Sequence, residues 1–378
     1  MIHQKQRAIS PFPNFNNLTF TVRKATVYAA AFLIATDAVA HSSDGSVLVL
    51  TCTRVIAVIG CSTSNISSRL KSKFPTSTNN CIGPENVTAS STTIISVNKL
   101  VILAHTWYNA FYHLTTEAIS RLMILHELIL FDPDIYILLQ YPVYTKSAKE
   151  LLELLGIADH RVIYYSSQME GSTLFRANII FIPRGINCGG APPGLLEQIH
   201  VKALSPSMIG KIPPKPYLSL PLPTAQVGRE NTPILRKGSF RVKNGPIILI
   251  SRSITRSRRI HNEIDILRFL AAEYTEIPLV IFYGNNSLVD TIALFNSARV
   301  LVAPHGAGQV HILWMRPGTV MIEISPRNNY NGCYQAIATY RQILTVIYID
   351  ATATAGSALK VDMKIFKDLF NQAMIGRY

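Results

Sequence analysis

The chain lacks several signatures that would assign it to a well-known enzyme class. It contains no Gly-x-Ser-x-Gly elbow, no Walker loop and no Gly-x-Gly-x-x-Gly fingerprint, which mark serine hydrolases, P-loop nucleotidases and dinucleotide-binding enzymes. Its five cysteines show no Cys-x-x-Cys or Cys/His spacing that would indicate zinc. No segment reads cleanly as a transmembrane helix. No recognisable DNA- or RNA-binding module is present.

Acidic residues are missing from one basic stretch. The 378 residues carry a formal net charge of +14, and 48% of them are hydrophobic, enough for two domains with large cores. A cluster of basic residues without acidic neighbours favours a phosphate-containing partner. We interpret its first half, up to Lys243, as a solvated loop and its second half, from Arg252, as phosphate-binding. The eight basic residues are Arg236, Lys237, Arg241, Lys243, Arg252, Arg256, Arg258 and Arg259.

The N-terminal region favours the secretory pathway. The first ninety residues hold three cysteines and three of the four Asn-x-Ser/Thr sequons, at Asn17, Asn65 and Asn86. Residues 27–35 are apolar and lead to Ala38-Val39-Ala40, as in a signal peptide, but Asp37 interrupts the pattern. A buried strand is the competing interpretation of this run. We expect an endoplasmic reticulum or Golgi lumen location and a candidate signal or membrane anchor within residues 1–90.

Strands and helices alternate from about residue 99 onward, which predicts parallel sheets covered by helices. Prolines interrupt this rhythm between residues 205 and 245. We therefore predict an irregular region over 1–90, a Rossmann-like domain over 91–225, a linker over 226–245 and a second α/β domain over 246–378. Strands are expected at 100–104, 134–140, 162–165, 179–182, 246–250, 279–283, 299–303, 319–324 and 344–349, and helices at 115–131, 147–155, 261–273, 288–297 and 361–375.

Two doubly wound halves joined by a linker describe an α/β fold of the GT-B type, with two Rossmann-like domains facing across a cleft. In such folds the ligand binds at the carboxyl ends of the parallel strands. The predicted site is therefore sought among residues that directly follow the apolar runs.

The most informative segment runs from residue 300 to residue 324. An apolar run is followed by His305-Gly306-Ala307-Gly308, a helix-like segment, and a second apolar run that contains Glu323. The glycines would permit positive φ and close backbone approach, and N–H groups at a helix start bind anions. Glu323 would accept hydrogen bonds from sugar hydroxyls. A tight turn without a ligand is the alternative interpretation.

Arg252 and Arg259 form the second candidate element. Arg252 follows the strand expected at 246–250, and Arg259 precedes the helix that opens at His261, with Asn262 as its expected cap. Guanidinium groups suit bidentate contact with a diphosphate, and their charge would stabilise a departing nucleoside diphosphate in place of a metal ion. The competing interpretation is that both are solvent-exposed surface arginines that bind no ligand.

His113, Glu117 and Arg121 form the third element, because their spacing places them on one face of a helix. A histidine oriented by a carboxylate can serve as a general base. A core histidine satisfied by Glu117 explains the spacing equally well. Asp132-Pro-Asp134 is interpreted as a turn, and no metal site is predicted.

Together these segments resemble glycosyltransferase family 61. The stretch ARVLVAPHGAGQVHILWMRPGTVMIEI is similar to the signature of that family, SRSITRSRRIHNE resembles its Arg-rich element, and NAFYHLTTEAISRL resembles its His-containing helix. Gln309 and Val310 depart from the family, which usually has Leu and a small or polar residue there.

The resemblance implies an inverting glycosyltransferase that moves a hexose or pentose from a UDP-sugar to a hydroxyl of a glycan or glycoprotein acceptor, without a metal cofactor. It implies His113, with Glu117, as the residues facing the acceptor. It implies that Glu323 binds the ribose of the nucleotide. The diphosphate would be held by Arg252, Arg259, His305, Gly306, Ala307 and Gly308.

Two alternatives stay open from the sequence. A non-catalytic module that binds nucleotide sugars or glycans would keep the glycine turn but need no base. A nucleic-acid-binding protein would explain the net charge, although we expect no nucleic acid partner, and its retention on DNA would depend steeply on salt.

Overall fold

The computed structural model describes part of the chain, and several sequence predictions lie outside that part. Among them are Cys52, Cys61, Cys81 and Cys188, the three N-terminal sequons, Arg256, the basic loop 236–243 and the linker 226–245 except its last residue. The described residues are 19–24, 29–41, 47–49, 55–56, 93–103, 110–140, 145–165, 173–183, 190, 192–205, 245–255, 257–330 and 332–375.

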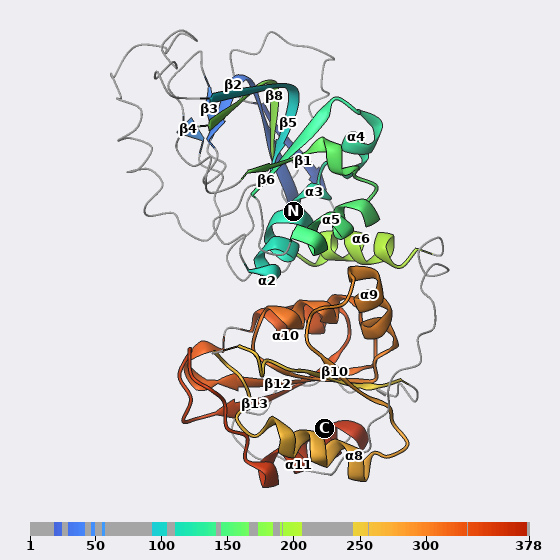
Figure 1. The fold of residues 1–378 in the computed structure, drawn as a ribbon. Coiled ribbons are helices and arrows are strands. Elements are labelled where there is room, and N and C mark those ends of the chain that lie inside the picture. The colour runs from blue at the N-terminus through green and yellow to red at the C-terminus, as the bar shows by residue number, and fades with distance from the viewer. Residues whose placement is uncertain are drawn as a thin grey trace, which may run out of the picture. The chain divides into compact units, whose positions relative to one another are not determined.

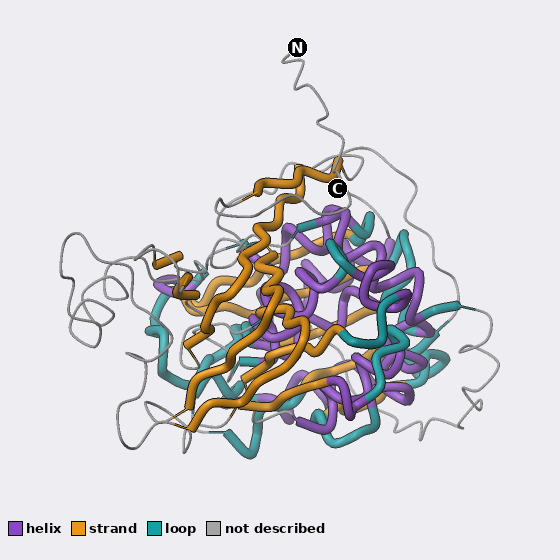
Figure 2. Tube along the Cα trace, turned by 90° about the horizontal axis from the view of Figure 1, so that it is seen from above, coloured by secondary structure: helices purple, strands orange, loops and turns teal. Residues whose placement is uncertain are grey.

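The chain divides into two compact units (Figure 1). Unit 1 comprises Met1–Thr106, Ile124–Tyr141 and His160–Gly185, and unit 2 comprises Trp107–Met123, Pro142–Asp159 and Ile186–Tyr378. Each unit is built on one sheet, and the trace in Figure 2 distinguishes their strands from their helices. The α/β class predicted from the sequence is confirmed.

Unit 1 contains a mixed sheet in the order β4-β3-β2-β8-β5-β6-β7, with β1 paired to β2. Strands β5, β6, β7 and β8 are parallel to their neighbours among themselves, whereas β2 runs antiparallel to β8, β3 and β1. The elements are β1 (Thr19–Lys24), β2 (Ala29–His41), β3 (Val47–Val49), β4 (Val55–Ile56), β5 (Thr93–Ile102), α4 (His126–Phe131), β6 (Ile135–Gln140), β7 (Val162–Tyr165) and β8 (Thr173–Pro183). The apolar run considered as a signal segment thus falls largely within a strand, β2.

Unit 2 contains a fully parallel sheet in the order β10-β9-β11-β12-β13. Figure 1 shows α8 and α11 against one face of this sheet and α9 and α10 against the other. The elements are β9 (Ile247–Ile250), α8 (Glu263–Glu273), β10 (Leu279–Phe282), α9 (Leu288–Ser297), β11 (Val300–Pro304), β12 (Val320–Pro326), α10 (Cys333–Tyr340), β13 (Leu344–Asp350) and α11 (Met363–Ile375).

Helical segments from earlier in the chain complete unit 2. A short α2 (Phe111–His113) continues into the π-helix η2 (Leu114–Ile119) and α3 (Ser120–Leu122), and α2 packs on the 3-10 helix η5 (Ala307–Trp314). Helices α5 (Thr145–Leu154) and α6 (Pro193–Ala203) pack on α9 and η5, respectively. The segment that carries the predicted base therefore lies in the same unit as the glycine turn.

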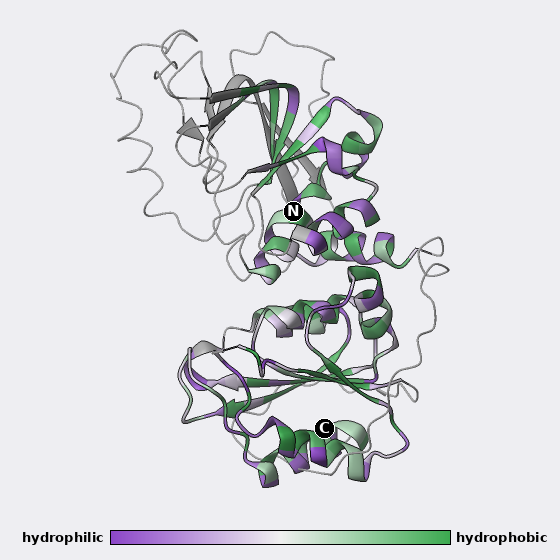
Figure 3. Cartoon of the chain, in the orientation of Figure 1, coloured by the Kyte–Doolittle hydropathy of each residue, from purple (hydrophilic) through white to green (hydrophobic). Residues whose placement is uncertain are grey.

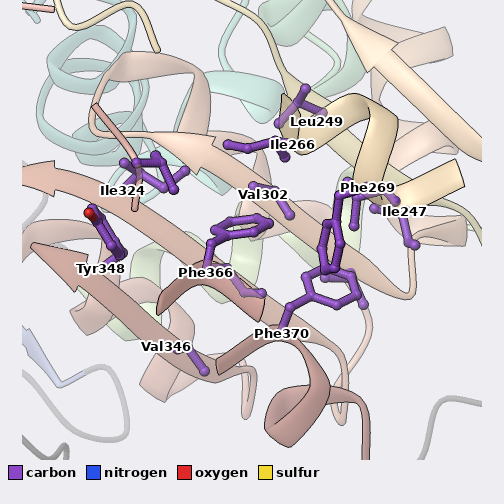
Figure 4. Packing of buried hydrophobic residues seen from close by; sticks show 14 of the residues in the cluster. Ile247, Leu249, Ile266, Phe269, Val302, Ile324, Val346, Tyr348, Phe366 and Phe370 are labelled. Atoms are coloured by element: carbon purple, nitrogen blue, oxygen red, sulfur yellow. The ribbon is translucent and has the colours of Figure 1, made fainter. Parts of the chain in front are cut away.

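The core between the sheet and helices α8 and α11 explains which side chains face the site. In Figure 3 the central strands are mostly hydrophobic, and Figure 4 shows Phe269, Phe366 and Phe370 grouped beneath them. Ile322 and Ile324 of β12 belong to this core. Because strand side chains alternate between faces, Glu323 projects to the opposite face, toward η5 and α10.

Most predicted elements are present within a few residues of their expected ends. Helix α5 ends beside Gly156, whose φ of +79° is the left-handed conformation that commonly ends a helix. Ser287 caps α9 by accepting a hydrogen bond from the backbone of Asp290 at 3.1 Å. Helices α6 and α10 were not predicted.

Two local predictions were wrong. The helix expected at 115–131 starts at Phe111, widens into a π-helix and is interrupted before α4. Asn262 stands at the start of α8, but its side chain bonds the backbone of Val361 instead of capping the helix.

Within the described part of the chain no helix is long and apolar enough to cross a membrane.

Candidate functional site

A buried histidine–glutamate pair lies at the carboxyl end of β11. Parallel pairing sets Ala303 beside Glu323, and the His305 backbone N–H continues the ladder by donating to the Ile324 carbonyl at 2.8 Å. His305 Nδ1 then donates to Glu323 Oε1 at 2.5 Å. Both side chains are buried, with 5% and 1% exposed, and Glu323 Oε2 has no hydrogen-bond partner among the described residues. The carboxylate therefore fixes the imidazole so that Nε2 is the nitrogen left for another partner.

The glycine turn itself is shaped by Arg252. A β-carbon on Gly306 would overlap Nη1 of Arg252, whose Nε donates to the Ser257 carbonyl at 3.2 Å. Gly306 has extended backbone with φ 164°, so the expectation of positive φ was wrong at this position. Glycine leaves room here for the guanidinium group, which a side chain at this position would displace. The predicted Arg252 and the predicted turn are thus brought together.

Ala307 and Gly308 open the 3-10 helix η5, where the sequence had indicated an anion-binding helix start. Both are partly exposed, and the Gln309 N–H already donates to the Gly306 carbonyl at 2.9 Å. A β-carbon on Gly308 would make only an ordinary contact, 3.5 Å from the Ile250 side chain. The two residues that open the helix are therefore accessible at the turn.

The structure separates the neighbouring arginines 258 and 259. Arg259 is exposed, and its carbonyl accepts from the Leu359 N–H at 2.8 Å. Arg258 is half-buried and adopts a left-handed φ of +55°. Sequence reasoning did not single out Arg258, because adjacent arginines give no local signal for which side chain turns inward.

The predicted base and its carboxylate are in contact. His113 Nδ1 lies 2.8 Å from Glu117 Oε1, and the His113 side chain is 21% exposed whereas that of Glu117 is fully buried. The buried Arg121 follows one turn later, where burial lowers its pKa to about 10 and the charge of Glu117 acts in the opposite direction. The three residues predicted to share a face therefore form one polar group inside an apolar segment.

The π-helix η2, which carries Glu117, contains hydroxyl groups that bond back to the main chain. Thr116 Oγ1 donates to the Tyr112 carbonyl at 2.8 Å, and Ser120 Oγ donates to the Thr116 carbonyl at 2.5 Å. Hydroxyl groups that bond to carbonyls four residues back disturb the regular helix, and π-type turns occur frequently at functional sites.

A row of rings connects the two histidine–glutamate pairs. The His113 ring meets Tyr112 edge-on at 5.3 Å, Tyr112 meets Tyr334 at 5.2 Å, and Tyr334 meets His305 at 5.1 Å. Burial raises the pKa of Tyr334 well above its usual range, so its hydroxyl stays protonated. Tyr112 and Tyr334 come from α2 and α10, which lie far apart in the sequence, and this contact could not be predicted.

Other histidines of unit 2 have structural partners. His311 is surrounded by Phe111, Phe282 and Phe295, and burial lowers its pKa to about 3. His200 donates from Nδ1 to the Leu313 carbonyl at 2.7 Å and accepts at Nε2 from Arg341. Both histidines are therefore held by the packing of unit 2.

The acidic residues offer no metal-binding cluster in the part of the chain that the structure describes. Asp132 accepts from Lys99 at 2.6 Å and from the Asp134 N–H at 3.1 Å, which is the turn predicted for Asp-Pro-Asp.

Comparison with known proteins supports the resemblance seen in the sequence. The family described as Glycosyltransferase 61 matches residues 111–322, which is more than half of the chain. A protein O-linked-mannose beta-1,4-N-acetylglucosaminyltransferase 2 from Xenopus tropicalis is 32% identical over 80 residues, and its Xenopus laevis counterpart is 35% identical over 80 residues. Each alignment covers 21% of this chain and 14% of the relative.

Proposed function

Because this chain belongs to glycosyltransferase family 61, we propose that it transfers a sugar from a UDP-sugar to a hydroxyl group of a glycan or glycoprotein, with inversion at the anomeric carbon. One observation carries the proposal: both histidine–glutamate pairs lie in one compact unit, at the two ends of one row of rings. The pair His305–Glu323 suits the donor, and the pair His113–Glu117 suits the acceptor.

The donor side is formed by the turn after β11. The Arg252 guanidinium and the His305 Nε2 would contact the diphosphate, and the N–H groups at the start of η5 would add neutral donors. Glu323 would neutralise an imidazolium at His305, and its unpartnered Oε2 supports the predicted contact with a ribose hydroxyl. The part that Arg259 plays stays a prediction.

The acceptor side is His113 with Glu117. Neutral His113 would take the proton of the acceptor hydroxyl, and the resulting oxygen would form a bond to the anomeric carbon on the face opposite the nucleotide. The bond between that carbon and the diphosphate oxygen would break, and its electron pair would leave with UDP. Glu117 would hold the imidazolium until its proton returns to solvent. A displacement of this kind inverts the anomeric configuration.

We also propose that guanidinium charge takes the place of a metal ion at the leaving group. The packing of Arg252 against the turn supports this role, because charge placed where negative charge develops lowers the barrier. The names of the two relatives make UDP-N-acetylglucosamine the first donor to test. The sequons and cysteines of the N-terminal region support a lumen of the secretory pathway.

A panel of UDP-sugars tests this function. We expect the correct donor to raise the melting temperature by mass action, and transfer to continue in EDTA. NMR of the product should show an anomeric configuration opposite to that of the donor. Stabilisation without turnover on any acceptor would favour a non-catalytic binding module, and a retained configuration would contradict the displacement at His113.

A further inference from the structure

We propose that Arg258, the residue before the exposed Arg259, supplies the second guanidinium of the donor site and contacts the diphosphate opposite Arg252. The inference rests on the proposed function and assigns one more residue to its donor site. It begins from the backbone, because a left-handed φ of +55° at a non-glycine residue is uncommon and costs free energy.

The surrounding chain holds this conformation in place. The Arg258 N–H donates to the Ser357 carbonyl at 3.0 Å, the Leu359 N–H donates to the Arg259 carbonyl at 2.8 Å, and Ile260 forms a bridge with Leu359. The segment is therefore fixed on both sides of the unfavourable residue. Because of this backbone conformation the two consecutive side chains point in different directions. Arg258 is half-buried, whereas Arg259 is exposed.

The side chain of Arg258 turns inward and acts electrostatically on the ring row. Its Nε is buried and has no hydrogen-bond partner among the residues that the structure describes. Its positive charge acts on the phenol of Tyr334, where it opposes the rise in pKa that burial causes. The Tyr334 ring contacts His305 at 5.1 Å. The charge of Arg258 therefore acts on the ring that contacts His305.

Arg252 reaches the same turn from the end of β9, since its Nη1 fills the space above Gly306. With Arg252 against the turn and Arg258 acting on the adjacent ring, two guanidinium groups would provide the paired, fork-shaped donors that a diphosphate binds. A buried Nε–H without a protein partner is costly unless a ligand accepts from it. The strained backbone at Arg258 is then explained by the ligand that it serves.

The test measures UDP and uridine affinities by calorimetry for the full chain and for Arg258→Gln, Arg258→Gly and Arg259→Gln. Arg268→Gln is the charge-matched control, because Arg268 is exposed on α8 and pairs with Asp265. We expect Arg258→Gln to weaken UDP binding 10- to 100-fold while uridine affinity stays unchanged. The loss should exceed that of Arg259→Gln.

Arg258→Gly separates binding from folding. Glycine adopts φ of +55° without strain, so this variant should melt no lower than the wild type and still lose UDP affinity. Equal UDP affinity in wild type and Arg258→Gln, or a loss carried by Arg259→Gln instead, would overturn the assignment. A wild-type protein that does not bind UDP would overturn the proposed function and this inference with it.

Discussion

At the scale of single residues, the site depends on contacts that sequence spacing cannot show. The pattern at residues 305–308 correctly located a turn after a buried strand, and the positions of His305 and Glu323 on adjacent parallel strands follow from that pattern. The sequence did not show why residue 306 is a glycine. It suggested a need for backbone freedom, whereas in the structure Arg252 occupies the space beside Gly306. Arg258 was missed for the same reason, since its direction is set by hydrogen bonds to residues near 357–359.

Gly306→Ala tests the role of this space. The new methyl group would displace the flexible end of Arg252 and leave the extended backbone unstrained. Loss of one charge-assisted hydrogen bond, about 1.5–3 kcal/mol, predicts roughly 10- to 100-fold weaker UDP binding, with the melting temperature nearly unchanged. Calorimetry and thermal unfolding measure both quantities.

Gly308→Ala is the matched comparison for that variant. Its methyl group would make only an ordinary contact with Ile250, so Arg252 should keep its position and the fold its stability. Equal UDP affinity in Gly306→Ala and the wild type would show that Arg252 does not need the space above the turn.

At the scale of elements, hydrophobic periodicity predicted the strands and the regular helices of unit 2 well. It failed over residues 115–131, where the apolar spacing is helical but the hydroxyl groups of Thr116 and Ser120 bond back to the chain and accompany a π-helix. Periodicity measures which face is apolar and does not register such competing hydrogen bonds. Helix α6 was missed because glycines and prolines precede it, and α10 was missed because it is short and follows Gly332.

The packing of η5 predicts a dependence of stability on pH. Burial lowers the pKa of His311 to about 3, below the value near 6.5 of an unfolded histidine. Below pH 6.5 the unfolded chain therefore binds a proton that the folded chain does not, and the free energy of unfolding falls as pH decreases. Between pH 6.5 and 5.0 the contribution is about 2 kcal/mol.

His311→Phe should remove that contribution, because phenylalanine fits among Phe111, Phe282 and Phe295 and does not titrate. Urea unfolding at pH 7.5 and pH 5.0 measures it for both proteins. The variant should lose less stability on acidification than the wild type, and other titrating groups cancel in the comparison. An identical loss in both proteins would mean that His311 is not held neutral.

At the scale of the whole molecule, the sequence predicted the α/β class and the family from three separated motifs. It could not predict that Trp107–Met123 and Ile186–Tyr378 share a compact unit. That grouping depends on packing between α2, η5 and α10, which are distant along the chain and have no mutual signature. This grouping brings the residues that we propose for the acceptor and for the donor into one compact unit.

The central claim is that His113 serves the acceptor while His305 serves the donor. Its most direct test is a paired measurement of UDP affinity and transfer rate in His113→Ala and His305→Ala, with the exposed His160→Ala as control. His113→Ala should keep wild-type UDP affinity and lose transfer by about 100-fold or more, as removal of a general base predicts, whereas His305→Ala should lose both. Wild-type transfer by His113→Ala would contradict the account.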